Sequence, residues 1–443
     1  MTTCTKSAAQ RRRGACPGLS APMPTGDGLL VRFHPVGTMA LTAFGEIAAA
    51  AREYGSGIIE ISARGSVQVR GLTTASAPHF ADAIAALGIA AADGVPVLSN
   101  ALAGLDAEET LDAGTLAADL RRALARTSLA AGLAPKVSVV IDGGGALSLD
   151  GTSADIRLHA TSINGARALV VGVGGDDRNA MVLGVIAPAN AVEAAARLLE
   201  VVARHGRAAR ARDVLSTESV APFATALADL LLISARPRGR RDPEPDTRRR
   251  GHERRTDPVG LHRLRDGSLA CGLGLAFGHT DAATLEGLTE SAAASGAIGM
   301  RAAPGRALMI IGLSPQTYSS FVAAAERLGF IVRADDPRRH VVACAGAPVC
   351  ASASIAARAI APLVADAAAP VIDRSFMIHI SGCAKGCAHP ATAALTAVGT
   401  AGGCALIANG SARDAPFATV AAHDLPGAIA RHAYNAKREI DHV

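Results

Sequence analysis

The chain has 443 residues, 49% of them hydrophobic and 19% charged, which is long enough for several domains with separate cores. Its formal net charge of +5 suits an acidic substrate but is too small to indicate nucleic-acid binding. No apolar run is long enough to span a membrane. The basic N-terminal stretch 1–14 lacks a following apolar region, so we expect a tail and not a signal peptide. These features predict a cytoplasmic protein that binds neither membrane nor nucleic acid.

The first elements in chain order recur later as a weak internal repeat. Alternating apolar residues and helical spacing predict strand, helix, strand and strand, at 27–31, 41–54, 57–61 and 67–72. The second copy has the same order, at 266–270, 281–294, 296–300 and 308–313. The repeat predicts two pseudo-symmetric halves and suggests that a monomer suffices.

A longer segment of Ala-rich helices and short Val/Ile strands follows each copy. In the first we expect a strand at 136–141, and in the second a strand at 371–380. The segment between the halves is rich in Arg, Asp, Pro and Gly, which predicts a linker or surface loop, unless it folds over an anionic ligand. The predicted domains are 20–80, 90–234, 260–325 and 333–436, with the linker at 235–259.

Five of the eight cysteines lie between Cys344 and Cys404, and such clustering favours metal or redox chemistry over disulfides. Cys344 and Cys350 form a C-x5-C pair, and Cys383 and Cys387 form a C-x3-C pair. Four thiolates from two loops are the usual ligands of a 4Fe-4S cluster. The small residues between them allow backbone N–H groups to approach the cluster sulfurs. We therefore expect these four cysteines to hold a 4Fe-4S cluster.

Two other interpretations of the cysteines stay open. Zinc is the main chemical alternative, although the C-x5-C pair is wider than the pairs of most structural zinc sites. The four cysteines could instead be buried core thiols, which fits poorly with two Gly-containing loops. Cys404 is expected to be a core thiol and not a fifth ligand.

At these cysteines the sequence resembles the nitrite/sulfite reductase superfamily, whose cluster motif is C-x5-C followed further along by C-x3-C. Within it the chain is most similar to the precorrin-3B synthase family, through RGACP at 13–17, PMPTGDGLL at 22–30 and HISGCAKGCAHP at 379–390. The resemblance covers most of the chain. It implies an α+β fold with two pseudo-symmetric halves, each a ferredoxin-like half-domain followed by a cluster-type α/β domain.

Two departures from sirohaem sulfite reductases support the synthase resemblance. Those enzymes carry two lysines in a K-x-K strand, where this chain has Lys136-Val137-Ser138, and Pro-Asn where it has Ala384-Lys385. Six-electron reduction of an oxyanion needs cations against the accumulating negative charge, so the loss of one weakens that function. A sirohaem nitrite or sulfite reductase stays open as the alternative, as does a non-catalytic electron-transfer or tetrapyrrole-carrier protein.

The synthase resemblance implies an oxidoreductase, a monooxygenase of aerobic cobalamin biosynthesis. Its members use O2 to hydroxylate precorrin-3A at C20 with γ-lactone formation. The resemblance implies a 4Fe-4S cluster, a mononuclear non-haem iron in place of sirohaem, and NADH as an indirect electron source through a separate reductase. His379 and His389 lie near the cysteine loop, but the sequence names neither a catalytic residue nor an iron ligand set.

The implied substrate is a polycarboxylate, which arginine side chains bind well. Arg64, Gln68 and Arg70 are expected to contact it, since their even spacing in a strand at 64–70 places them on one face. Arg64 to Gln68 also resembles the superfamily motif R-x-N-x-Q, with Ser in place of Asn. The alternative is a solvated polar face. Lys136 is a further candidate contact and Lys385 could adjust the charge of the cluster, or both face solvent.

Overall fold

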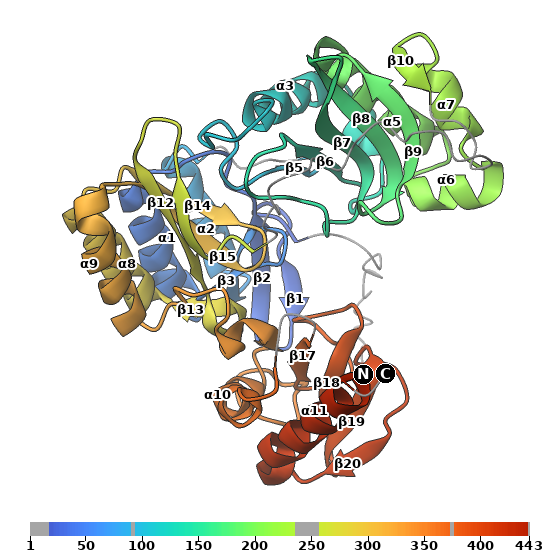
Figure 1. Cartoon of the computed structure of the whole chain (residues 1–443). Coiled ribbons are helices and arrows are strands. Elements are labelled where there is room, and N and C mark those ends of the chain that lie inside the picture. The colour runs from blue at the N-terminus through green and yellow to red at the C-terminus, as the bar shows by residue number, and fades with distance from the viewer. Residues whose placement is uncertain (1–16, 90–93, 235–256, 373–375, 442–443) are drawn as a thin grey trace, which may run out of the picture. The chain divides into compact units, whose positions relative to one another are not determined.

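The computed structural model describes residues 17–89, 94–234, 257–372 and 376–441 (Figure 1). The chain forms two compact units. One comprises Ala92–Thr256 with Met1–Pro17, and is called the 92–256 unit below; the other comprises Gly18–Ala91 and Asp257–Val443, and is called the cysteine unit. In the described ranges, no helix combines the length and hydropathy needed to cross a membrane. The expected tail at 1–14, Cys4, Cys16 and most of the expected linker at 235–259 lie outside the described residues.

The cysteine unit opens with the first predicted half-domain. Its elements are β1 (Met23–Thr25), β2 (Gly28–Phe33), α1 (Leu41–Tyr54), β3 (Ile58–Ile61), β4 (Val67–Leu72) and α2 (Ser76–Ala86). The strand order is β1-β2-β4-β3, with β13 at the far edge. The predicted helix at 41–54 and strand at 67–72 are confirmed with the same bounds, because regular apolar spacing marks both.

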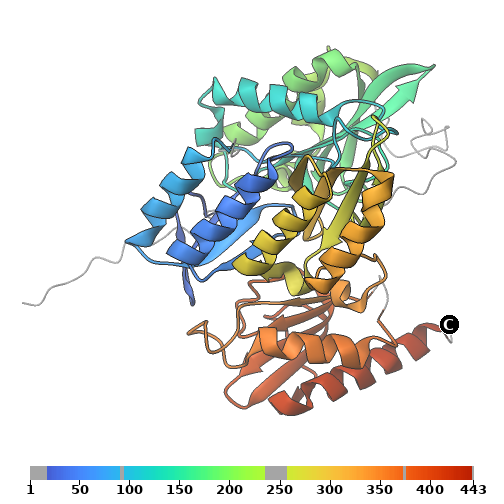
Figure 2. The ribbon, with the colours of Figure 1, turned by 90° about the vertical axis from the view of Figure 1, so that its left-hand side faces the viewer.

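The second half-domain repeats this order. Its elements are β11 (Gly260–Arg263), β12 (Leu269–Gly274), η2 (Ala276–Gly278), β13 (His279–Asp281), α8 (Ala282–Ala294), β14 (Gly299–Ala303), β15 (Ala307–Leu313) and α9 (Pro315–Arg327). The order β11-β12-β15-β14 matches β1-β2-β4-β3, which confirms the predicted pseudo-symmetry. Strand β13 crosses to pair antiparallel with β3, and one hydrophobic core spans both half-domains. Helices α2, α1, α8 and α9 lie side by side in one layer (Figure 2).

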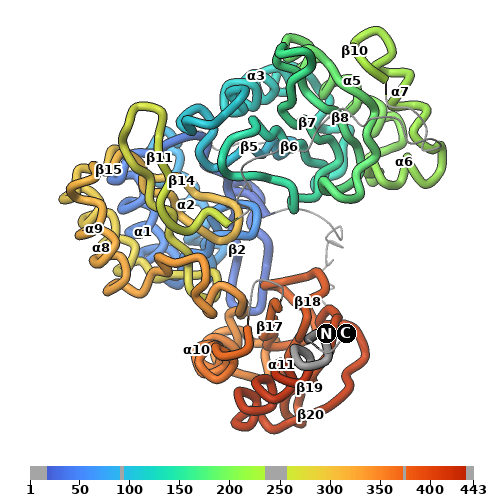
Figure 3. Tube along the Cα trace, in the orientation of Figure 1, coloured from blue at the N-terminus to red at the C-terminus, as the bar shows by residue number. Residues whose placement is uncertain are grey.

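The rest of the cysteine unit is an α/β region. Its elements are η3 (Pro337–His340), β16 (Val341–Ala343), α10 (Ala357–Ala368), β17 (Ile378–Ser381), β18 (Ala393–Thr400), β19 (Gly403–Gly410), β20 (Ala418–Val420), η4 (Ala422–Asp424) and α11 (Leu425–Asp441). The sheet runs in chain order from β16 to β20. Strands β16, β17 and β18 are parallel, and β19 and β20 continue antiparallel. Helices α10 and α11 lie beside this sheet (Figure 3).

The 92–256 unit has the same strand pattern. Its elements are β5 (Val97–Ser99), α3 (Ala113–Ala125), α4 (Leu129–Gly132), β6 (Val139–Asp142), β7 (Ala154–Ile163), β8 (Ala166–Gly175), β9 (Met181–Ile186), η1 (Pro188–Asn190), α5 (Ala191–Arg204), α6 (Ala211–Glu218), α7 (Ala221–Leu227) and β10 (Leu231–Ser234). Strands β5, β6 and β7 are parallel, and β8 and β9 follow antiparallel. The internal repeat therefore extends to the larger segments.

Five predicted strands begin at least three residues too early. The strand expected at 266–270 begins at Leu269, because Gly267 has a φ of +86° in a turn, and the strand expected at 296–300 begins at Gly299, because the Ala297 N–H bonds back to Ala292 on α8.

The strand expected at 371–380 begins only at Ile378, because the Val371 N–H bonds back to the Ala368 carbonyl at the end of α10. The strand expected at 136–141 begins at Val139, and Lys136 lies in the preceding turn. Arg64 lies in the turn before β4, so the expected strand at 64–70 covers only its second part.

Candidate cluster-binding site

The four predicted cysteines lie on two loops that leave neighbouring parallel strands. Cys344 directly follows β16, and Cys383 follows β17 after one glycine. Because the carboxyl ends of parallel strands meet at one edge of a sheet, the loops start side by side. The Gly382 N–H donates to Cys344 Sγ at 3.0 Å, and the Ser354 N–H donates to the Gly382 carbonyl at 2.8 Å. These bonds tie the first loop to the second.

The loops need small residues at their closest approach. A Cβ atom at position 382 would lie 2.6 Å from Cβ of Ala353, and one at position 346 would lie 2.4 Å from the Ala357 nitrogen. Gly346 also has a φ of +68°, in the left-handed region. Glycine is therefore required at both positions, for space and at one also for conformation.

The thiols act on one another electrostatically. Burial raises the pKa of Cys344. The backbone N–H groups of Gly382 and Gly346 lower this pKa, and the charges of Cys350 and Cys383 raise it further. Cys387 is exposed as a residue, but partial desolvation of its thiol likewise raises the pKa, and the Arg70 guanidinium opposes this shift. The charges of the other three cysteines add to the raised pKa of Cys387. The structure thus brings the four thiols into one neighbourhood.

The four Sγ atoms do not stand in the close-packed arrangement of a bound zinc site. A tetrahedral zinc ion with Zn–S bonds of about 2.3 Å holds its sulfurs roughly 3.8 Å apart. Among the described residues, no three of the four Sγ atoms lie within 4.8 Å of one another.

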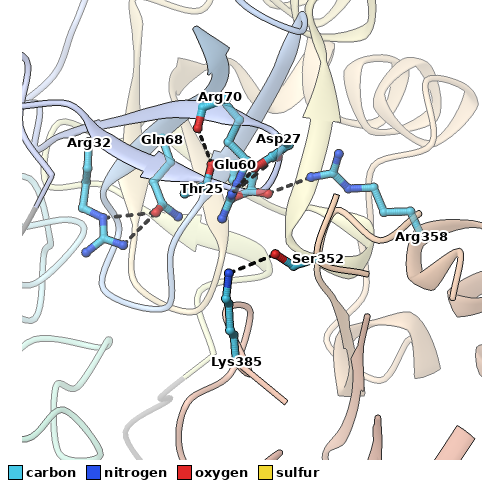
Figure 4. A network of polar contacts seen from close by, with 10 residues as sticks. Thr25, Asp27, Arg32, Glu60, Gln68, Arg70, Ser352, Arg358 and Lys385 are labelled. Carbon is cyan, nitrogen blue, oxygen red and sulfur yellow. Dashed lines mark hydrogen bonds and ion pairs between the residues drawn. The ribbon is translucent and has the colours of Figure 1, made fainter. Parts of the chain in front are cut away.

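A chain of buried ion pairs lies close to the cysteine loops (Figure 4). The Arg70 guanidinium donates to Glu60 at 3.0 Å and to Asp27 at 3.1 Å. The second oxygen of Glu60 accepts from Arg358, on α10, at 2.7 Å. The side chains are 4% exposed for Asp27, 10% for Arg70, 13% for Glu60 and 18% for Arg358. The chain of charges joins the first half-domain to the α/β region that carries the cysteines.

The predicted substrate contacts have different surroundings. Gln68 and Arg70 lie two residues apart on β4, so they share a face, and both are buried. Oε1 of Gln68 accepts from Arg32 at 2.7 Å and 3.1 Å. Arg64 is exposed in the turn before β4, and Lys136 is exposed in the 92–256 unit. The expected common face therefore holds two of the first three residues.

Lys385 links the two cysteine loops. Its Nζ donates to Ser352 Oγ at 3.0 Å, as Figure 4 shows. Ser352 follows Cys350 by two residues, and Lys385 stands midway between Cys383 and Cys387. A positive charge is thereby held at both loops.

Two histidines flank the second cysteine loop, His379 before it on β17 and His389 after it. His379 is fully buried on β17, and neither of its ring nitrogens has a hydrogen-bond partner in the described structure. Burial lowers its pKa to about 4, so the ring is neutral at pH 7. The ring centroid lies 5.8 Å from that of His389, whose Nε2 contacts the Thr392 carbonyl oxygen at 3.1 Å. The pair adjoins the loop, but the described residues supply no third metal ligand beside it.

The 92–256 unit carries no cysteine at the equivalent strand ends. Asn100 follows β5 there, and its Oδ1 accepts from the Gly143 N–H at 2.8 Å, in the loop after β6. Ligand atoms of Asp142, Asp150 and His159 lie within 4.8 Å of one another. Both oxygens of Asp142 accept backbone N–H groups, from Gly144 and Leu149, which explains its place without a metal ion.

Sequence reasoning missed Gly26, Asp27, Glu60 and Arg358. Asp27 and Arg358 are 331 residues apart, so only folding shows that one ion-pair chain includes both. The sequence signal for Glu60 is a carboxylate between the apolar residues of a strand.

Comparisons with known proteins agree with the fold and show the family. Residues 21–87 match the nitrite/sulfite reductase ferredoxin-like half domain. The solved structure of the Mycobacterium tuberculosis NirA protein has a TM-score of 0.72, with 20% identity over 93% of this chain and 81% of that chain. This likeness shows the fold alone. The chain is also 39% identical over 424 residues to a Sinorhizobium precorrin-3B synthase, covering 96% of this chain and 88% of the relative.

The two-loop cysteine site and the repeated fold thus occur in a sequence of which 96% aligns with that relative. The chain therefore belongs to the precorrin-3B synthase family of oxidoreductases.

Proposed function

We propose that the chain catalyses the O2-dependent hydroxylation of precorrin-3A at C20, with γ-lactone formation, and that a 4Fe-4S cluster on Cys344, Cys350, Cys383 and Cys387 serves this reaction. One observation carries the proposal: four thiols gather at two parallel strand ends in a chain 39% identical to a precorrin-3B synthase. The overall reaction takes up O2, two electrons and two protons. One oxygen atom enters the product and the other leaves as water.

The residues around the thiols fit a cluster. The N–H groups of Gly382 and Gly346 favour the thiolate form of Cys344, and the Arg70 guanidinium favours that of Cys387. Four free thiols on two loops also suit a cubane, in which each thiolate binds a different iron. When bound, the cluster supplies electrons one at a time, and we propose a mononuclear non-haem iron as the place where O2 is activated.

On the substrate side, we propose that Arg64 and Gln68 contact the carboxylates of the tetrapyrrole. Arg64 is exposed in a turn, so its guanidinium can reach a ligand, and Gln68 is held in place by Arg32. Arg70 is also a proposed contact, but Asp27 and Glu60 already fix its guanidinium, so its main proposed role is to stabilise the Cys387 thiolate. Lys136 is a further proposed anionic contact in the 92–256 unit.

We also propose a separate electron-donating reductase, with NADH as the indirect electron source, and a cytoplasmic location. Support for the donor comes from the family alone. A dedicated donor is reasonable because a cluster close to the protein surface can accept electrons from a docked partner, and Cys387 is exposed.

The test is a single-turnover assay with precorrin-3A, a chemical reductant and O2 labelled with oxygen-18. We expect O2 consumption and a product that carries one labelled oxygen atom. Unlabelled product, or no O2 consumption by cluster-loaded protein, would contradict the proposal. Reduction of nitrite or sulfite by protein with bound sirohaem would support the reductase alternative instead.

A further inference from the structure

The turn between β1 and β2, formed by Thr25, Gly26, Asp27 and Gly28, lies against the first cysteine loop. A Cβ atom at position 26 would lie 2.4 Å from Cys350 Sγ, a distance that real Cβ atoms do not show. The Ser352 nitrogen would lie 3.3 Å from the same atom. Glycine at position 26 therefore leaves just enough space for the thiol.

Space, and not backbone conformation, is what requires glycine at this position. Gly28 in the same turn has a φ of +107°, in the left-handed region that favours glycine. Gly26 has no such φ, so the main obstacle to an alanine there is the Cys350 thiol, and the Ser352 nitrogen is a smaller one. The requirement at position 26 thus comes from the cluster loop.

The turn is held in place from both sides. The Ala351 N–H donates to the Gly26 carbonyl at 2.9 Å, which joins the turn to the cysteine loop. On the other side, Asp27 pairs with Arg70, and the Thr25 hydroxyl donates to Asp27 at 2.6 Å. If the turn moves away from Cys350, the Gly26–Ala351 hydrogen bond breaks and the partly buried Asp27–Arg70 ion pair is disturbed.

We propose that the β1–β2 turn is a wall of the cluster site, and that Gly26 is a positioning residue for Cys350. The first half-domain contributes no cysteine, yet its turn limits where the Cys350 thiolate can stand. The inference rests on the proposed cluster for its functional meaning. Its steric basis belongs to the protein alone.

The test compares Gly26→Ala, Cys350→Ala and the double variant, each in the full chain. Gly402→Ala is the matched control, because a Cβ atom there meets nothing within 4 Å and its φ is ordinary. Acid-labile sulfide and the visible spectrum are measured after anaerobic purification. Urea unfolding of cluster-free protein is then measured for all variants.

We expect Gly26→Ala to lose most of its sulfide while Gly402→Ala keeps it. In cluster-free protein, Gly26→Ala should lower the urea midpoint clearly when Cys350 is present. In the Cys350→Ala background it should lower the midpoint only slightly. Retention of wild-type sulfide by Gly26→Ala, or an equal loss of stability in both backgrounds, would overturn the inference. Wild-type protein without sulfide would contradict the proposed cluster instead, and the unfolding comparison would still decide the role of Gly26.

Discussion

The Gly382 N–H donates to Cys344 Sγ at 3.0 Å, and this bond joins the loops that follow two parallel strands. The 92–256 unit has the same bond at the equivalent strand ends, but its acceptor is Oδ1 of Asn100 and its donor is Gly143, at 2.8 Å. One half of the repeat thus ties its loops with an amide, and the other uses a thiol that can also bind metal.

This equivalence predicts the effects of Cys344→Asn and Cys344→Ala. Both variants should lose the cluster, because each removes one thiolate ligand. The free energy of unfolding of Cys344→Asn should be about 1 kcal/mol higher than that of Cys344→Ala, because the Asn side-chain oxygen can accept the Gly382 N–H. Acid-labile sulfide and urea unfolding measure the two effects. Cys404→Ala is the control and should keep the cluster, because Cys404 is a fully buried core thiol.

Glu60 stands between two guanidinium groups, so Glu60→Gln leaves Arg70 and Arg358 without their shared carboxylate. Breaking a buried pair from one side costs about 3 kcal/mol of unfolding free energy. The matched control is Glu286→Gln, whose partner Arg52 is 57% exposed, and it should change stability by less than about 1 kcal/mol. Urea unfolding measures both. Similar small effects in the two variants would contradict the structural role of the ion-pair chain.

Lys385 should raise the reduction potential of the cluster, because a positive charge favours the reduced, more negative state. Lys385→Gln removes that charge, and we expect a potential lower by roughly 20–60 mV, the equivalent of about 1 kcal/mol. Lys385→Arg should leave the potential near its wild-type value. Spectroelectrochemical titration of the purified protein measures it. An unchanged potential in Lys385→Gln would show that solvent screens the side chain fully.

Arg64 should act on substrate affinity and not on the cluster. Arg64→Ala should raise KM for precorrin-3A about tenfold, the effect of losing one charge-assisted hydrogen bond, while the sulfide content stays constant. Arg263→Ala, an exposed arginine of the same unit, should leave KM unchanged. Steady-state O2 consumption measures KM. Equal effects of the two substitutions on KM would show that Arg64 does not contact the substrate.

His279 should make the protein less stable in mild acid. Burial, with a smaller contribution from the Arg358 charge, lowers its folded-state pKa from the usual 6.5 to about 4. Between these values the unfolded chain takes up a proton that the folded chain does not, so stability is full above pH 6.5 and falls as pH drops. His279→Gln should therefore lose about 1–2 kcal/mol less than wild type between pH 7 and pH 5. Urea unfolding at both pH values tests this, with the exposed His423→Gln as control.

Local patterns predicted α1 and β4 well, because helical apolar spacing marks α1 and alternating apolar residues mark β4. Local patterns predicted the wrong strand bounds where a neighbouring element determines the backbone conformation. The segment before Ile378 is apolar enough for a strand, yet its start completes the turn that ends α10. Spacing and residue type pointed to the four cysteines. Contacts such as Gly26 with Cys350 depend on tertiary packing, which no local pattern contains.

The most direct test of the account is the metal content and visible spectrum of the chain purified without oxygen. We predict about four acid-labile sulfides and slightly more than four irons per chain, with a broad shoulder and no sharp sirohaem bands. Sharp sirohaem bands would contradict the hydroxylase and favour a reductase. One zinc per chain without sulfide would contradict the cluster on Cys344, Cys350, Cys383 and Cys387.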